Sequence, residues 1–216
     1  MSKLHKNREY YARTTWTVEK VQKEINEGLA LLNSIDNKIV AFFGSHRITQ
    51  TNKFYQHCKK VSRALGEKGY AILSGGGPGI MHAANSGARG AGVPSIGLKA
   101  ELLTKEQIKD SIYTHELSFH FIFVRRFIMS IKSDALIFYP GGYGTLNELF
   151  EYLTLMQTGI VDIVPIICVN RKYWKGLFDW LESNPVRDGF LIHNKEDLKL
   201  LHLVDEIDEI LAILKQ

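Results

Sequence analysis

The chain has 216 residues, of which 45% are hydrophobic, and it carries a formal net charge of +4. This length predicts one large globular domain. We expect it to lie in a reducing cytoplasm, because Cys58 and Cys168 are too few for a disulfide framework and neither a membrane span nor a secretory signal is apparent. Residues 1–15 hold four basic side chains against one acidic one, so the rest of the chain is nearly neutral and a nucleic-acid partner is not expected.

The sequence predicts helices that alternate with short buried strands after the basic start. Val18, Val21 and Ile25 recur at helical spacing, which predicts an amphipathic helix over 17–34. Residues 100–118 are expected to form a loop with short helical pieces. The other predicted strands are 38–44, 70–74, 93–98, 135–139, 164–169 and 200–203, and the other predicted helices are 52–68, 80–91, 123–132, 145–158, 173–181 and 204–214.

Strands that are apolar throughout and alternate with helices favour a parallel sheet covered on both faces. No linker, repeat or low-complexity segment interrupts this pattern. We therefore expect a basic segment and helix over 1–36, followed by a single doubly wound, Rossmann-like α/β domain over 37–216. Ligands of such sheets bind at the carboxyl ends of the strands, so the loops that follow the strands are the candidates for a site.

Three glycine-containing loops follow predicted strands. The sequence is GSHR at 44–47, SGGGPG at 74–79 and PGGYGT at 140–145. Glycine lets backbone N–H groups approach an anion closely, and the helix that follows adds its positive end. Glycines of this kind also serve tight turns alone, but two glycine-rich turns between strand and helix in one sheet favour an anion site.

Motifs that the chain lacks narrow the choice of anion. There is no G-x-x-x-x-G-K-[ST] run, so the protein is not a P-loop NTPase. Ile80 stands where a dinucleotide fingerprint requires its third glycine, and no acidic residue ends the following strand, which argues against NAD. A mononucleotide or a sugar phosphate fits better.

Charged residues accompany the PGGYGT loop. The run TLNE that begins at Thr145 fits a helix capping box with Thr145 as the N-cap. A carboxylate beside an anion site repels the ligand, however, so Glu148, with Glu151 one turn further, suggests a chemical task. Arg125 and Arg126 lie in a mostly apolar segment, and their guanidinium groups suit phosphate or carboxylate oxygens. Neighbours on a helix are turned about 100° apart, so we expect the two arginines to have different partners.

These motifs together resemble the LOG family of nucleoside 5′-monophosphate phosphoribohydrolases, first known as cytokinin-activating enzymes and long labelled lysine decarboxylases. The resemblance rests on Arg125-Arg126, SGGGPGIM at 74–81 and PGGYGTLNEL at 140–149. It covers roughly 39–181 and is to the longer, bacterial-type branch. It implies a nucleoside monophosphate as substrate, no cofactor, and a homodimer or larger oligomer with its site near the interface.

The resemblance also implies roles for individual residues. Glu148 and Arg125 form the catalytic pair, and Arg126 and Thr154 lie near the substrate. Arg126 stands where the family usually has lysine, and Asn147 stands where plant-type members often carry a second glutamate. The remaining residues implied to bind the substrate are Gly44, Ser45, Gly76, Gly77, Gly79, Gly141, Gly142, Tyr143, Gly144 and Thr145.

The implied reaction is hydrolysis of the N-glycosidic bond of an AMP-like nucleotide to free base and ribose 5-phosphate. Cleavage leaves positive charge on the ribose, which a carboxylate can stabilise while it orients or deprotonates the attacking water. We assign this task to Glu148, with Arg125 steadying the phosphate or the leaving base. No metal is expected, because the eight histidines show no metal-binding spacing.

Two other functions stay open on the sequence. A non-catalytic nucleotide or molybdenum-cofactor binding protein, or sensor, could use the same loops, and a single-stranded DNA-binding relative could share the fold. The nearly neutral body disfavours DNA, and the presence of Glu148 and Arg125 favours an enzyme. A pyridoxal-phosphate decarboxylase is excluded on chemistry, because it needs a Schiff-base lysine and Lys132 lies at the wrong end of the predicted strand 135–139.

Overall fold

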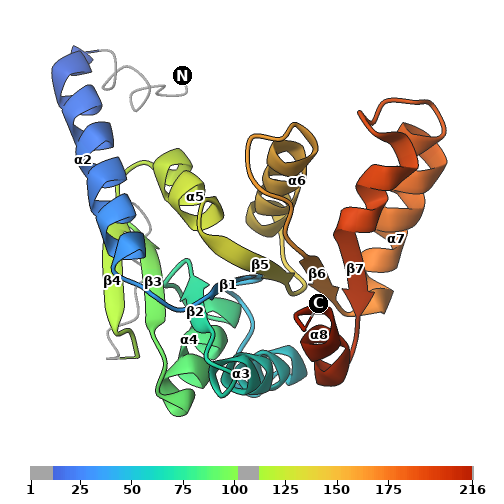
Figure 1. Ribbon diagram of the computed structural model, residues 1–216, viewed down its shortest axis with the longest axis horizontal. Coiled ribbons are helices and arrows are strands. Elements are labelled where there is room, and N and C mark those ends of the chain that lie inside the picture. The colour runs from blue at the N-terminus through green and yellow to red at the C-terminus, as the bar shows by residue number, and fades with distance from the viewer. Residues whose placement is uncertain (1–11, 102–111, 216) are drawn as a thin grey trace, which may run out of the picture.

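A parallel sheet forms the centre of the protein in the computed structural model, which describes residues 12–101 and 112–215 (Figure 1). The sheet has seven strands in the order β4-β3-β2-β1-β5-β6-β7. Every neighbouring pair is parallel. The strands are β1 (Ile39–Phe43), β2 (Ala71–Ser74), β3 (Ser95–Ala100), β4 (His115–Phe119), β5 (Ser133–Phe138), β6 (Ile166–Val169) and β7 (Leu201–Val204).

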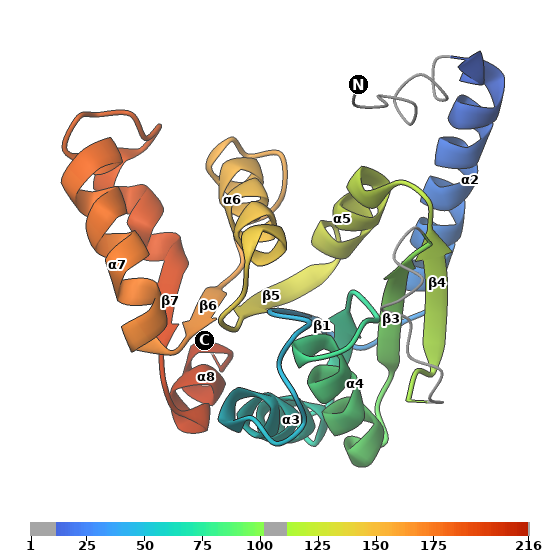
Figure 2. The ribbon, with the colours of Figure 1, turned by 180° about the vertical axis from the view of Figure 1, so that it is seen from behind.

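Helices cover both faces of this sheet (Figures 1 and 2). One face carries α2 (Thr14–Asn33), α5 (Ile122–Ser130), α6 (Tyr143–Gln157) and α7 (Arg171–Leu181). The other face carries α3 (Lys53–Gly66), α4 (Ile80–Ala91) and α8 (Ile207–Ile213). A π-helical turn (Glu182–Val186) and a 3-10 helix (Asn194–Leu200) connect α7 to β7. The predicted doubly wound α/β architecture is therefore confirmed.

Two apolar cores lie against the two faces, and β1 contributes to both. Ala41 and Phe43 pack in the core under α2, α5 and α6, whereas Val40 and Phe42 pack in the core over α3 and α4. Successive side chains of a strand point to opposite faces, so a strand covered on both sides is apolar at every position. This is why the central strands could be recognised as continuous apolar runs.

The prediction for 100–118 is wrong at its end, where β4 forms an edge strand beside β3. Of its side chains only Phe119 is fully buried, and the others alternate between half-buried and exposed. An edge strand has a neighbour on one side only, so it needs no apolar run, and none marks it in the sequence. Residues 102–111, the greater part of the predicted loop, lie outside the described residues.

The predicted start of α6 is also wrong. The helix begins at Tyr143 with Gly142 as its N-cap and without a side-chain cap, so Thr145 is not the N-cap. Gly142 is still extended, the helical conformation begins at Tyr143, and Thr145 lies buried inside the first turn.

Both cysteines are free and buried. Within the two described stretches, no helix combines the length and the apolar character required to cross a bilayer.

Close packing of α4 on α3 generates a prediction about Gly87. A Cβ atom there would lie 1.9 Å from the Ser62 hydroxyl and 2.4 Å from the Lys59 carbonyl oxygen, so one of the helices must move. We expect Gly87→Ala to lower the free energy of unfolding by about 1–3 kcal/mol, measured by urea denaturation. Gly90→Ala is the matched control on the same helix, because no atom lies within 4 Å of its Cβ position. The control should leave stability unchanged or raise it by up to about 1 kcal/mol, and equal losses in both variants would contradict the packing argument.

Candidate functional site

The three glycine loops meet at the carboxyl ends of β1, β2 and β5, in the middle of the sheet. Ser45 joins them, because its N–H donates to the Pro140 carbonyl at 3.1 Å and its own carbonyl accepts from the Ile80 N–H at 3.2 Å. The strand order changes direction between β1 and β5, which is where ligands bind in open α/β sheets. The sheet therefore holds the three loops in one place.

Gly79 makes the contact between the first two loops possible. Its φ angle is +68°, and a Cβ atom would lie 2.3 Å from the Ser45 carbonyl oxygen. No other residue type tolerates both the left-handed backbone and this approach without moving the loops apart. Gly79 thus supports the site from behind, and it does not line the cavity described next.

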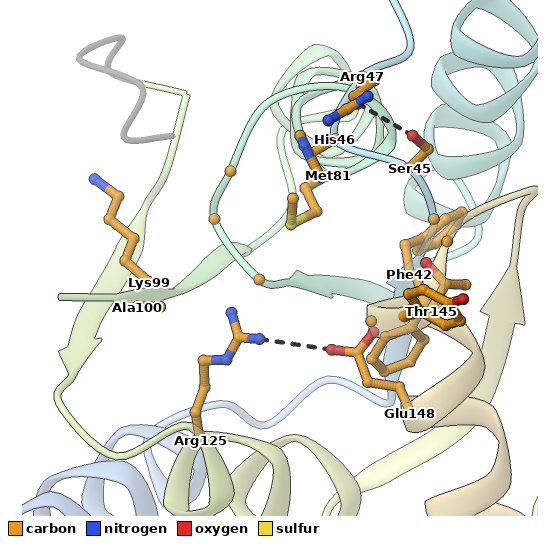
Figure 3. Close-up of a pocket in the computed structure, with 18 residues that line it drawn as sticks. Phe42, Ser45, His46, Arg47, Met81, Lys99, Ala100, Arg125, Thr145 and Glu148 are labelled. Atoms are coloured by element: carbon orange, nitrogen blue, oxygen red, sulfur yellow. Dashed lines mark hydrogen bonds and ion pairs between the residues drawn. The ribbon is translucent and has the colours of Figure 1, made fainter. Parts of the chain in front are cut away.

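A cavity of about 590 Å³ opens between the loops, β3, α5 and α6 (Figure 3). Among the described residues that line it, Glu148 is the only acidic one. Three basic side chains line it as well, namely Arg47, Lys99 and Arg125. The described part of the cavity is therefore predominantly cationic, as a phosphate-bearing ligand requires.

Most residues predicted for the site line this cavity. They are Gly44, Ser45, Gly76, Gly77, Arg125, Gly142, Tyr143, Gly144, Thr145 and Glu148. Four predicted residues do not line it: Gly79, as described above; Gly141, which lies against Thr145; Arg126, which pairs with Glu151; and Thr154, which is exposed and donates its hydroxyl to the Phe150 carbonyl.

Several residues that line the cavity were not among the site residues predicted from the sequence, although some of them lie in the glycine loops. They are Phe42, Phe43, His46, Arg47, Gly75, Met81, Lys99 and Ala100. Lys99 is the most informative of them, because it is a charged residue on an otherwise apolar strand and lies near its carboxyl end. Its ammonium group pairs with Glu116 at 2.7 Å and lies 4.8 Å from the centre of the Tyr113 ring. Its position near the carboxyl end of a predicted strand could have indicated that Lys99 lies at the site.

Two ion pairs connect α5 to α6 beside the cavity. Arg125 Nη2 lies 3.6 Å from Glu148 Oε1, and Arg126 Nε lies 2.5 Å from Glu151 Oε2. The expectation that the adjacent arginines have different partners is therefore confirmed. Figure 3 shows the Arg125 side chain pointing from α5 toward Glu148 on α6.

The absence of a side chain at Gly75 lets the Arg125 guanidinium group lie against the loop. A Cβ atom on Gly75 would lie 3.0 Å from Arg125 Nη1, and the same nitrogen lies 3.5 Å from the Leu98 carbonyl oxygen. The guanidinium group is thus held between the glycine loop, β3 and Glu148. Only about 12% of the Arg125 side chain and 15% of the Glu148 side chain are exposed, so both charges are largely removed from water.

Burial controls the protonation of Glu148. It raises the pKa of the carboxyl group from 4.5 to about 7, although Arg125 and Arg126 lower it, and Glu151 adds to the increase. Burial outweighs the arginines because the carboxylate loses its hydration while the nearer guanidinium remains 3.6 Å away. A carboxyl group that titrates near neutrality can accept or release a proton during a reaction.

The site and fold define the class of protein: an α/β protein whose cavity, at the ends of the central strands, is lined by glycine loops, basic side chains and a desolvated carboxylate. A sequence profile for the family described as "possible lysine decarboxylase" matches residues 81–214. Over 126 residues the chain is 33% identical to the cytokinin riboside 5′-monophosphate phosphoribohydrolase of Mycobacterium tuberculosis, and the aligned region covers 57% of this chain and 67% of that protein. Over 152 residues it is 27% identical to the protein of the same name from Mycobacterium marinum, with 70% and 80% covered.

Among solved structures, the molybdenum cofactor binding protein from Rippkaea orientalis shares the fold, with a TM-score of 0.63 and 18% identity over 84% of this chain and 98% of that chain. Identity at this level shows the fold alone. The profile match extends over more than half of the sequence, and the chain belongs to this family, which is the LOG family that its motifs resemble.

The decarboxylase wording of the family description does not fit the lysines of this chain. Lys132 lies at the amino end of β5, where its ammonium group donates to the Leu32 and Ile35 carbonyls. Lys99 lies in the cavity but is ion-paired with Glu116. Schiff-base chemistry requires an amine that is free to attack a carbonyl, whereas Lys132 is bonded to two backbone carbonyls and Lys99 to a carboxylate.

The raised pKa of Glu148 generates a prediction about stability. Because the folded protein holds a proton there up to about pH 7 and the unfolded chain releases it near pH 4.5, the Glu148 contribution to stability falls as the pH rises between these values. We expect wild-type protein to lose stability relative to Glu148→Gln between pH 4.5 and 7, and no further above that range. Urea denaturation of both proteins at intervals of pH measures the difference, and a difference independent of pH would contradict the burial argument.

Proposed function

We propose that the protein is a nucleoside 5′-monophosphate phosphoribohydrolase, which cleaves the N-glycosidic bond of an AMP-like nucleotide to free base and ribose 5-phosphate. The observation that carries the proposal is the desolvated Glu148, paired with Arg125 beside a loop suited to phosphate. The names of the mycobacterial relatives support it. A protein that only bound a nucleotide would gain nothing from a buried carboxylate next to its phosphate.

The substrate phosphate is proposed to bind at the start of α6. Gly142, Tyr143, Gly144 and Thr145 form the first turn of this helix and its N-cap, and all four line the cavity. The free N–H groups and the positive end of the helix dipole favour an anion there. The ribose is then proposed to lie next to Glu148, which is one helical turn further along α6.

Glu148 then acts at C1′ of the ribose. In its ionised form it stabilises the positive charge that develops on the ring and accepts a proton from the attacking water. A bond forms between the water oxygen and C1′ as the bond from C1′ to the base nitrogen breaks, and the leaving base takes up a proton. Arg125 keeps Glu148 oriented toward the cavity and holds the pKa of its carboxyl group below the value that burial alone would produce.

We also propose that a second copy of the chain covers the outer surface of α5 and α6. Large apolar side chains are exposed there next to the cavity: Ile122 (38%), Phe123 (54%), Phe127 (45%) and Phe150 (36%). Aromatic side chains in such numbers are typical of interfaces between proteins. The Arg126–Glu151 pair lies on the same two helices, so a dimer would bury it further.

The first test is product identification with AMP. We expect wild-type protein to release adenine and ribose 5-phosphate, and Glu148→Gln to reduce kcat by about 10²–10⁴, because the variant can neither accept the proton nor carry the negative charge. Glu151→Gln is the matched comparison, since it is a glutamate on the same helix that does not line the cavity, and its loss should be far smaller. Release of adenosine and phosphate, or of nothing from several nucleoside monophosphates, would refute the proposal.

The second test concerns the dimer. We expect wild-type protein to sediment as a dimer and Phe127→Asp to sediment as a monomer, because a charge would be buried in an apolar contact. Phe190→Asp is the control, since Phe190 is 78% exposed in the segment between α7 and β7. A monomeric wild type, or a dimer that persists in Phe127→Asp, would contradict this arrangement.

A further inference from the structure

Tyr173 is bonded to the PGGYGT loop from outside the cavity. It lies in the first turn of α7, and its hydroxyl donates to the Gly141 carbonyl at 2.5 Å. Its side chain does not line the cavity, and 45% of the residue is exposed. The bond therefore connects the loop to α7, which has no part in the proposed hydrolysis.

The start of α7 is itself firmly held. The Asn170 N–H donates to the Val204 carbonyl of β7, and the Asn170 side chain accepts from the Tyr173 N–H at 2.8 Å. Arg171 pairs with Asp205 and Glu209 at the start of α8. Tyr173 is thus anchored at the end of β6 by contacts with β7 and with the start of α8.

A fixed Gly141 carbonyl sets the direction of the next N–H group. No peptide bond among the described residues is cis, and in a trans peptide the C=O of one residue and the N–H of the next point in opposite directions. Gly141 lies behind the cavity while Gly142 lines it. With its carbonyl held outward by Tyr173, Gly141 leaves the Gly142 N–H directed toward the cavity.

The neighbouring carbonyls are held in the same manner. The Pro140 carbonyl accepts from the Ser45 N–H, and the Gly142 carbonyl accepts from the Leu146 N–H as the helix begins. Tyr173 supplies the bond for the peptide unit between them. Glycine has a wider choice of backbone conformations than other residues, so the Tyr173 hydroxyl restricts the orientation of the Gly141–Gly142 peptide unit.

We propose that Tyr173 is a positioning residue for the 5′-phosphate of the substrate: its hydroxyl orients the Gly141–Gly142 peptide so that the Gly142 N–H faces the phosphate. This inference rests on the proposed function in one respect, namely that a phosphate binds at this loop. It predicts an effect on phosphate binding and not on the chemical step at C1′, because Tyr173 touches neither Glu148 nor the cavity.

The test compares two matched substitutions. Tyr173→Phe removes only the hydroxyl that Gly141 accepts. Tyr70→Phe removes a hydroxyl that donates to the Leu214 carbonyl at 3.1 Å, away from the cavity, so it controls for the loss of one bond between tyrosine and the backbone. For both variants and the wild type, kcat and KM for AMP, the Kd for ribose 5-phosphate by calorimetry, and the melting temperature are measured.

We expect Tyr173→Phe to raise both KM for AMP and the Kd for ribose 5-phosphate by about 3- to 10-fold, the usual effect of one lost hydrogen bond, with kcat unchanged. Tyr70→Phe should change neither constant. An unchanged Kd in Tyr173→Phe, a loss confined to kcat, or failure of the wild type to bind ribose 5-phosphate would overturn the inference.

Failure of the proposed function would look different. If the wild type binds ribose 5-phosphate but releases no base from any nucleotide, the weaker binding by Tyr173→Phe still supports the positioning role while the hydrolase proposal fails. If both variants lower the melting temperature and weaken binding equally, the effect is general destabilisation and the positioning role is refuted.

Discussion

The site depends on the parallel pairing of β1 with β2 on one side and β5 on the other. This pairing places the ends of three strands at one edge of the sheet, and each strand is followed by a loop that contains glycine. Ser45 then joins the loops through its own backbone, with its N–H on the Pro140 carbonyl and its carbonyl on the Ile80 N–H. Because these contacts use backbone atoms, the arrangement of the three loops is determined by the fold and by the positions of the glycine residues.

The charges next to these loops determine which chemistry the site can support. A helix N-terminus attracts anions, yet Glu148 lies one turn into the same helix, where its charge opposes a bound phosphate. Burial resolves this conflict in part, because it raises the pKa of the carboxyl group to about 7 and leaves the group able to exchange a proton. Arg125 opposes that shift and neutralises the carboxylate when it forms. The close approach at Gly75 lets the guanidinium reach this position.

The parts of the structure that local pattern determines could be predicted from the sequence. The apolar central strands, the helices between them, the glycine loops and the separate partners of Arg125 and Arg126 all follow from periodicity and residue chemistry. β4 could not be predicted, because an edge strand bears no apolar run. The start of α6 was displaced because glycine at the N-cap takes the place of a threonine cap. The contacts of Lys99 and Tyr173 could not be predicted, because they join segments that are distant in the chain.

The central claim is that the fold holds Glu148 desolvated against Arg125 with a carboxyl group that titrates near neutrality. Carbon NMR of protein labelled at the glutamate carboxyl carbons, recorded over a range of pH with Glu148→Gln to assign the signal, measures this directly. We expect one resonance, absent from the variant, to titrate with a pKa of about 7. A Glu148 resonance that titrates at the ordinary value near 4.5 would contradict it.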